Sequence, residues 1–358
     1  RGLGDVYKRQ APVSTQKDVD AAYAAAEDAF DGWRDATPSV RQKALLDFAD
    51  TVEARAEELV AAEVENCGKP IELVRSEEIG PMVDQIRFFA GAARVLEGKA
   101  AGEYMAGHTS WVRREPVGVV GQVAPWNYPM MMAIWKLAPA IAAGNAVVLK
   151  PSDTTPVSTL LLAEMAAESL PPGVLNVICG DRDTGRTLVS HPTPAMVAIT
   201  GSVRAGMQGA AAASSDVQRV PQELGGKAPG VVFADADLEA AAVGIAGAGF
   251  FIAGQDCTAS TRVIASPGVY SDLVDALAEQ ARATVATASV GVEHEDALLP
   301  AVNNAAQLEK VSGFIDRLPD HARLAAGGSR VGDAGFHYSA TVVADLLQTD
   351  EIVQNEVF

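Results

Sequence analysis

Short apolar runs alternate with helical segments between residues 117 and 233, and this alternation limits the possible folds more than any other feature. The apolar runs lie at 117–124, 145–149, 173–178, 195–200 and 229–233. The helical segments lie at 130–143, 156–169, 184–190 and 204–213. Apolar strands that alternate with helices are typical of a parallel sheet covered on both faces. Such sheets bind ligands at the carboxyl ends of their strands. The alternation restarts after residue 234, which predicts a second α/β unit.

The region before these runs, residues 16–100, is predicted to be helical. Apolar residues from Val19 to Phe30 follow the spacing of one helix face. Ser39 is expected to cap a second helix that ends near Cys67, and a third helical stretch is expected at 81–96.

Composition excludes several classes of function. The formal net charge is −18, and an acidic chain repels phosphate backbones, so we expect no nucleic-acid partner. Residues 116–135 carry no charge, but three prolines and several polar groups interrupt them, so we expect no membrane partner. The three cysteines are widely spaced, which indicates neither a disulfide framework nor a metal site. We therefore expect a reducing, cytoplasmic location.

Both ends of the chain are unusual. Residues 1–10 have no clear helix or strand period, and we expect them to be a non-native segment. The chain stops at Phe358 directly after an apparently structured segment, so we expect a fragment that by itself has little or no catalytic activity.

Two side chains are candidates for covalent and acid–base chemistry. Cys257 lies in the segment GQDCTA, where Gly254 permits unusual backbone angles. A polar turn that opens a helix would stabilise its thiolate. Glu223 precedes two glycines and would act as a general base if its pKa were raised. Taken alone, a buried inert cysteine and a surface glutamate are the simpler interpretations.

Three further segments lie where predicted strands end. Asn127 stands between Pro125 and Pro129, so its amide would be held rigidly and could donate to a developing oxyanion. Lys150 ends the next strand. Gly201 begins a glycine-containing turn at a helix start, which suits a phosphate group.

Together these segments resemble the aldehyde dehydrogenase superfamily. Five motifs of that superfamily occur in the expected order: PWNYP, KPSD, ITGS, ELGGK and GQDCTA. Within the superfamily, the sequence is most similar to the 4-aminobutyraldehyde dehydrogenases. The resemblance implies an α/β fold with a Rossmann-like NAD-binding domain at 11–98 and 116–225. It also implies an oligomerisation hairpin at 99–115 and an incomplete catalytic domain at 226–358.

The resemblance assigns three catalytic residues. Cys257 would be the nucleophile that adds to the aldehyde carbon and forms a thiohemiacetal and then a thioester. Asn127 and the Cys257 N–H would hold the oxyanion, and Glu223 would activate the hydrolytic water. No metal is implied.

The resemblance also implies NAD as the cofactor and assigns residues that contact it. They are Trp126, Lys150, Ser152, Asp153, Gly201, Ser202, Leu224, Glu356 and Phe358. A carboxylate at Asp153 would bind a ribose 2′-hydroxyl and repel a 2′-phosphate, which favours NAD over NADP.

The expected substrate is 4-aminobutyraldehyde or a related aminoaldehyde, as in polyamine degradation. Asp256, Tyr128 and Trp135 would form a site for its ammonium group, since a carboxylate and aromatic faces suit a cation. The other interpretation is that Asp256 caps a helix after Cys257 and that Trp135 belongs to the core. A homodimer or homotetramer is implied for the full-length protein.

Four alternatives remain open at this stage. Betaine aldehyde or succinate semialdehyde could be the substrate. A CoA-acylating enzyme would share the nucleophile, but such enzymes generally lack a base at Glu223. A non-catalytic protein would place no demand on Asn127, Glu223 and Cys257 together.

Overall fold

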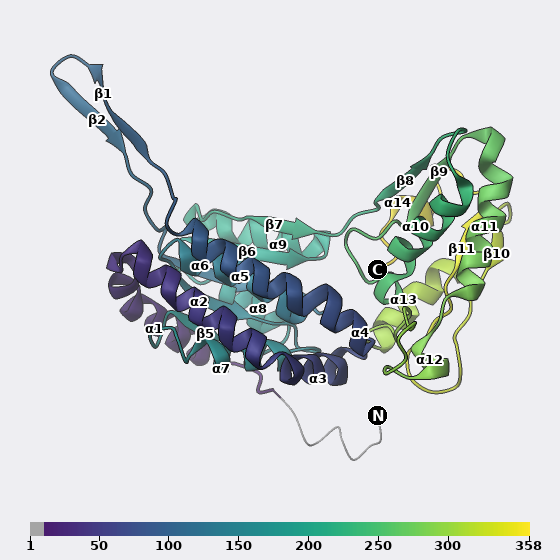
Figure 1. Cartoon of the computed structure of the whole chain (residues 1–358), viewed down its shortest axis with the longest axis horizontal. Coiled ribbons are helices and arrows are strands. Elements are labelled where there is room, and N and C mark those ends of the chain that lie inside the picture. The colour runs from purple at the N-terminus through teal and green to yellow at the C-terminus, as the bar shows by residue number, and fades with distance from the viewer. Residues whose placement is uncertain (1–10) are drawn as a thin grey trace. The chain divides into compact units, whose positions relative to one another are not determined.

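The structure is a computed structural model that describes residues 11–358, which form two compact units (Figure 1). Among these residues the first unit comprises 11–66 and 75–223, and the second comprises 67–74 and 224–358. The predicted boundary near residue 225 is close to this division, but residues 67–74 belong to the second unit. The assignment of the units to cofactor binding and catalysis stays a prediction, and the predicted non-native segment 1–10 lies outside the described residues.

A five-stranded sheet forms the centre of the first unit, with the strand order β5-β4-β3-β6-β7. Its strands are β3 (Val119–Val123), β4 (Ala146–Lys150), β5 (Leu175–Val177), β6 (Met196–Gly201) and β7 (Gln222–Leu224). β3 pairs in parallel with β4 on one edge and with β6 on the other, and β4 pairs in parallel with β5. The predicted parallel sheet is therefore confirmed. The run at 229–233 is the exception, because it forms a strand of the second unit.

Helices cover both faces of this sheet (Figure 1). One face contacts α1 (Gln16–Asp35), α8 (Arg182–Val189) and α9 (Val203–Ala213). The other contacts α6 (Pro129–Ala142) and α7 (Val157–Ala166), with α2 (Pro38–Ala54) and α5 (Gly80–Ala92) packed behind them. Val19 and Tyr23 of α1 pack with Val148 of β4 and Val197 of β6 in the core of the first face.

The N-terminal helices differ from the prediction in two places. Thr37, rather than Ser39, occupies the N-cap of α2, because Pro38 begins that helix and proline suits its first position. The predicted single helix to Cys67 is interrupted at Arg55, where α3 (Ala56–Cys67) begins. No glycine or proline marks that interruption. The helix then ends as predicted, since Gly68 has a left-handed backbone with φ of 75°.

Shorter elements complete the first unit and its junction with residues 67–74. They are α4 (Ile71–Val74), the π-helix η1 (Arg75–Ile79), and a hairpin of β1 (Lys99–Met105) and β2 (His108–Val112). The hairpin is almost wholly exposed; Trp111, for example, is 64% exposed. Trp33 is instead buried and donates its indole N–H to the Ile141 carbonyl at 3.0 Å. The role of the hairpin in oligomerisation stays a prediction.

The second unit is also α/β, as predicted. Its parallel pair is β8 (Pro229–Val232) with β9 (Arg262–Ala265), and its antiparallel pair is β10 (Arg323–Ala326) with β11 (Val342–Ala344). The helices are α10 (Leu238–Phe250), α11 (Tyr270–Ala283), α12 (Thr287–Val290), α13 (Ala305–Asp316) and α14 (Glu351–Gln354). Short 3₁₀ turns in this unit are η3 (Phe251–Gly254) and η4 (Pro267–Val269), while η2 (Ser214–Asp216) belongs to the first unit. Ile71 of the 67–74 segment donates its N–H to the Val292 carbonyl at 2.9 Å, which ties that segment to this unit.

No helix among residues 11–358 is long and apolar enough to cross a membrane.

A glycine in the central strand should be intolerant of substitution. A Cβ at Gly121 would lie 2.6 Å from the Tyr23 hydroxyl and 3.1 Å from Leu188. We expect Gly121→Ala to lower the free energy of unfolding by about 1–3 kcal/mol through overpacking. Gly32→Ala is the control, because a Cβ there meets nothing within 4 Å in helix α1 and should stabilise by about 0.5–1 kcal/mol. Urea denaturation measures both, and equal effects of the two variants would contradict the packing of β3.

Candidate functional site

The predicted site residues of the first unit gather at the carboxyl edge of the sheet. The chain runs from β3 through β4 to β5 in one direction and then crosses to β6 and β7 on the other side. The order therefore reverses between β3 and β6, which is where open α/β sheets bind ligands. Asn127 follows β3, Lys150 ends β4 and Gly201 ends β6. The fold thus brings together three segments that are far apart in the sequence.

Asn127 lies in the turn that joins β3 to α6. The turn is short because α6 begins at Pro129, and the Asn127 side chain is only 6% exposed. Tyr128 is also buried. Trp135 of α6 is 45% exposed, so the alternative interpretation that it belongs to the core is wrong.

Lys150 is a buried ammonium group whose position is fixed by the backbone. Its Nζ donates to the carbonyl oxygens of Pro151 and Gly180, each at 2.8 Å, and burial lowers the pKa of its side chain. An ammonium group has three N–H donors, so a third can serve a ligand hydroxyl. Ser152 donates to the exposed Asp153 carboxylate at 3.2 Å. These groups fit the ribose contacts that the resemblance implies.

Ser202 caps the helix that follows β6. Its hydroxyl accepts a hydrogen bond from the Ala205 N–H at 3.3 Å, and α9 begins at Val203. The N-terminal N–H groups of a helix carry a partial positive charge that favours phosphate. The Gly201–Ser202 turn therefore fits the diphosphate of a dinucleotide.

Lys136 is a functional candidate that the sequence argument missed. It lies on α6, and burial lowers the pKa of its amine to about 8, while the Glu223 carboxylate acts in the opposite direction. Glu223 is exposed and lies in β7, the strand beside β6. No motif marks Lys136, because only the packing of α6 on the sheet places its amine near the predicted base.

Cys257 is an exposed thiol in a turn of the second unit. Asp256 Oδ1 accepts hydrogen bonds from the Thr258 N–H at 2.8 Å and from the Thr258 hydroxyl at 2.7 Å. The expected helix after Cys257 is wrong: the turn leads to strand β9 at Arg262. Asp256 therefore braces a turn around Cys257 and caps no helix.

The two glycines after Glu223 bring the second unit's predicted site residues together. A Cβ at Gly225 would overlap the Glu356 carboxylate, and the Gly226 N–H donates to Glu356 Oε1 at 3.3 Å. A Cβ at Gly226 would lie 3.9 Å from the Cys257 carbonyl oxygen. Leu224 begins this segment. Glu356 and Cys257 therefore lie against neighbouring residues of one turn, and at Gly225 only a residue without a side chain leaves room for the Glu356 carboxylate.

Two lysines lie near the partly buried Glu356 carboxylate. Burial raises the pKa of its carboxyl group, and nearby Lys310 and Lys227 oppose this. Burial, together with the charge of Arg262, lowers the pKa of Lys227 to about 8, and Glu356 opposes that shift. Glu356 and Lys227 thus partly neutralise each other.

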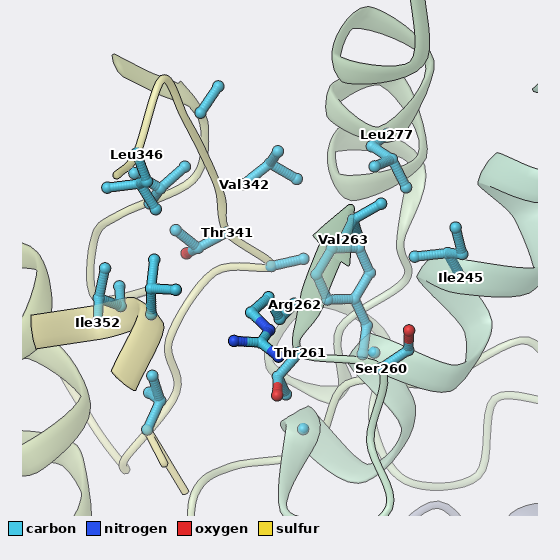
Figure 2. Close-up of a pocket in the computed structure, with 18 of the residues that line it drawn as sticks. Ile245, Ser260, Thr261, Arg262, Val263, Leu277, Thr341, Val342, Leu346 and Ile352 are labelled. Carbon is cyan, nitrogen blue, oxygen red and sulfur yellow. The ribbon is translucent and has the colours of Figure 1, made fainter. Parts of the chain in front are cut away.

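An apolar cavity of about 440 Å³ lies within the second unit, and the sequence argument did not anticipate it. Figure 2 shows Val263 and Leu277 facing Val342 and Ile352 across it, with Arg262 between them. Its lining includes Gln255 and Phe358. The lining residues come from separated segments, so no local pattern could reveal the cavity.

The predicted catalytic residues are divided between the units. Asn127 and Glu223 belong to the first, and Cys257 belongs to the second. Within each unit the structure groups the predicted residues, as described above.

Comparison with known proteins decides the family. The profile of the aldehyde dehydrogenase family matches residues 6–358. The chain is 39% identical over 352 residues to the geranial dehydrogenase of Castellaniella defragrans, covering 97% of this chain and 73% of that protein. The chain belongs to the aldehyde dehydrogenase family.

Solved structures of aldehyde dehydrogenases support the same family assignment. An NAD-dependent aldehyde dehydrogenase from Sinorhizobium meliloti matches with a TM-score of 0.93 and 38% identity, over 97% of this chain and 69% of that one. The NAD⁺ complex of a Bacillus cereus aldehyde dehydrogenase matches with a TM-score of 0.92 and 32% identity, over 97% of this chain and 71% of that one. The predicted α/β fold and the predicted class, an NAD-dependent aldehyde dehydrogenase, are confirmed. The roles of individual residues and the substrate stay predictions.

The buried amine of this dehydrogenase should make its stability depend on pH. The pKa of Lys136 is about 8 in the folded protein and 10.5 ordinarily, so at pH 7 the folded state bears the cost of a buried charge. We expect Lys136→Met to raise the free energy of unfolding at pH 7 by on the order of 3 kcal/mol. The advantage should shrink from pH 8 to pH 10.5, because the folded wild-type protein releases its proton first.

Urea denaturation at several pH values measures this difference. Lys43→Met is the control, since the Lys43 side chain is 75% exposed and should give no comparable gain. A gain for Lys136→Met that does not change with pH would contradict the lowered pKa.

Proposed function

We propose that this dehydrogenase oxidises an aldehyde to the carboxylate with Cys257 as nucleophile, Asn127 as oxyanion donor and Glu223 as base. One observation carries the proposal: the exposed Cys257 turn and the Glu356 carboxylate lie against Gly226 and Gly225, directly after Glu223. A structural protein would place no such demand on a reactive thiol, two glycines and a carboxylate.

The reaction begins at the thiol. Cys257 loses its proton, and its thiolate forms a C–S bond to the aldehyde carbon while the carbonyl electrons move to oxygen. The rigid Asn127 amide and the Cys257 N–H donate to that oxyanion, and uncharged donors stabilise it without any rearrangement. NAD, when bound, would supply the acceptor for the hydride that leaves this carbon. The oxyanion electrons then re-form the C=O bond, which leaves a thioester on Cys257.

Hydrolysis completes the cycle. Glu223 removes a proton from water as the water oxygen attacks the thioester carbon. The C–S bond then breaks, the carboxylate leaves, and the Cys257 thiolate is restored. The Lys136 amine lies near the Glu223 carboxylate, which opposes the lowering of the lysine pKa by burial.

Cofactor binding would use the carboxyl edge of the first unit's sheet. Lys150 and Asp153 would hold the adenosine ribose, and the Gly201–Ser202 turn would hold the diphosphate. Trp126 and Ser152 would line the same edge. In the second unit Leu224, Glu356 and Phe358 would contact the nicotinamide half.

Separate variants should block the two halves of the reaction. Cys257→Ser should abolish NADH formation, because a serine hydroxyl is a far weaker nucleophile at neutral pH. Glu223→Gln should retain a stoichiometric burst of NADH but lower the steady-state rate by about 10²–10⁴-fold, because it impairs only hydrolysis. Stopped-flow absorbance distinguishes the two. A Glu223→Gln enzyme with normal turnover would rule out its role as the base.

We also propose an aminoaldehyde, such as 4-aminobutyraldehyde, as the substrate. Asp256 is only partly exposed and carries a carboxylate beside the nucleophile, while Trp135 offers an exposed aromatic face. An apolar aldehyde is the second candidate, because the Castellaniella defragrans relative is a geranial dehydrogenase. The hydrogen bonds from Thr258 to Asp256 also give that carboxylate a structural task.

Comparison of kcat/KM for 4-aminobutyraldehyde, butanal and geranial separates these candidates. Recognition of the ammonium group should favour the amine over butanal by about tenfold or more. Asp256→Asn, which preserves the acceptor for Thr258, should remove that preference. If geranial or butanal is the better substrate, the aminoaldehyde proposal fails while the aldehyde dehydrogenase activity stands.

A further inference from the structure

Three consecutive residues before the Cys257 turn adopt left-handed backbone conformations. The φ angles are 42° at Ile252, 63° at Ala253 and 70° at Gly254. Glycine adopts such angles readily, but a β-branched isoleucine does so at a cost. Conformations of this kind persist only where the surrounding structure holds them.

Packing supports part of this run, because Ile252 is 2% exposed and Ala253 packs against the apolar cluster that includes Leu299 and Ala340. Ala253, Gly254 and Gln255 also line the cavity, so one side of the left-handed run borders open space. On that side hydrogen bonds add to the packing.

The Gln255 amide makes those hydrogen bonds. Its side chain is 7% exposed, and Nε2 donates to the Ile252 carbonyl at 2.9 Å and to the Ala301 carbonyl at 3.4 Å. Its Oε1 accepts from the Asn303 N–H at 2.8 Å. One buried amide thus joins the strained residue to a distant segment of the chain.

That distant segment is itself anchored. Val302 donates its N–H to the Phe336 carbonyl at 3.0 Å, and the Asn304 side chain caps α13 by accepting from the Gln307 N–H at 2.9 Å. Gln255 therefore connects the Cys257 turn to the start of a helix. The segment 299–304 matches no sequence motif. Here it serves as the anchored segment to which Gln255 ties the Cys257 turn.

We propose that Gln255 is a positioning residue that fixes the Cys257 thiol for attack on the aldehyde, through the left-handed run and residues 301–303. The inference rests on the proposed function, in which Cys257 is the nucleophile. Gln255 makes no bond to the substrate. It acts by limiting the directions in which the Cys257 turn can move.

The first test removes the amide and keeps the size of the side chain. Gln255→Met should lower the rate of the NADH burst by about tenfold to a hundredfold, since misplacement of a reacting group by about 1 Å costs that much. The KM for NAD should not change. Gln307→Met is the matched control, because Gln307 lines the same cavity and its buried Nε2 has no hydrogen-bond partner among residues 11–358. Both variants should have similar Tm values.

The second test uses a side chain that has a hydrogen-bond donor only when it is protonated. Gln255→Glu keeps an acceptor for the Asn303 N–H but, when ionised, has no donor for the Ile252 carbonyl. Burial raises the pKa of such a carboxyl group, and protonation restores one donor. The burst rate of Gln255→Glu relative to wild type should therefore rise as the pH falls from about 8 to about 5.5. A loss of stability would change the amplitude of the burst, which counts folded enzyme, whereas misplacement of the thiol changes its rate constant, so this test also stands if Gln255→Met fails to fold.

The outcomes separate the two proposals. A wild-type burst that survives in Cys257→Ser, or no burst at all, would overturn the proposed function. A normal wild-type burst with equal rates in Gln255→Met and Gln307→Met, or a pH-independent ratio for Gln255→Glu, would overturn only the role of Gln255.

Discussion

The first unit depends on the pairing of β3 with strands on both of its edges. Val119, Val120, Gly121 and Gln122 are all buried, so each backbone N–H and C=O in this strand must be hydrogen-bonded inside the protein. Parallel ladders to β4 and β6 satisfy them. Parallel strands share one carboxyl edge, so this pairing also decides that Asn127, Lys150 and Gly201 meet at the same edge of the sheet.

A second constraint is the close approach at Gly225 and Gly226. The Glu356 carboxylate occupies the space that a side chain at Gly225 would need, and the Cys257 carbonyl lies beside Gly226. The same crowding buries Glu356 and Lys227 and moves the pKa of each toward its neutral form. At Gly225 glycine is required for room and not for its backbone angles, since this residue has no left-handed backbone.

The positions of the predicted reactive and cofactor-binding groups are held by hydrogen bonds to side chains and carbonyl groups that form no bond to the reacting carbon. Asp256 binds Thr258 on one side of Cys257, and Gln255 binds Ile252 and Asn303 on the other. Lys150 is held by two carbonyl groups in the same way. In each case a polar group has hydrogen-bond partners that also fix its direction, and for Gln255 and Lys150 that group is buried.

Local patterns predicted the parts of the fold that local physics controls. Apolar runs marked β3, β4, β5 and β6 within a few residues, because strands buried on both faces must be apolar. The interruption of the helix at Arg55 and the second-unit location of β8 escaped prediction. No glycine or proline marks the first, and a run of apolar residues does not specify its partner strand.

The sequence by itself determined the family, the α/β fold and the identity of the candidate residues. Motifs and strand ends can be recognised from short runs of consecutive residues. Only the tertiary structure decided which groups act on one another. Lys136 and Glu223 are 87 positions apart, and Gln255 and Asn303 are 48 apart. Their interactions depend on how helices and loops pack, and packing brings together residues that no spacing in the sequence connects.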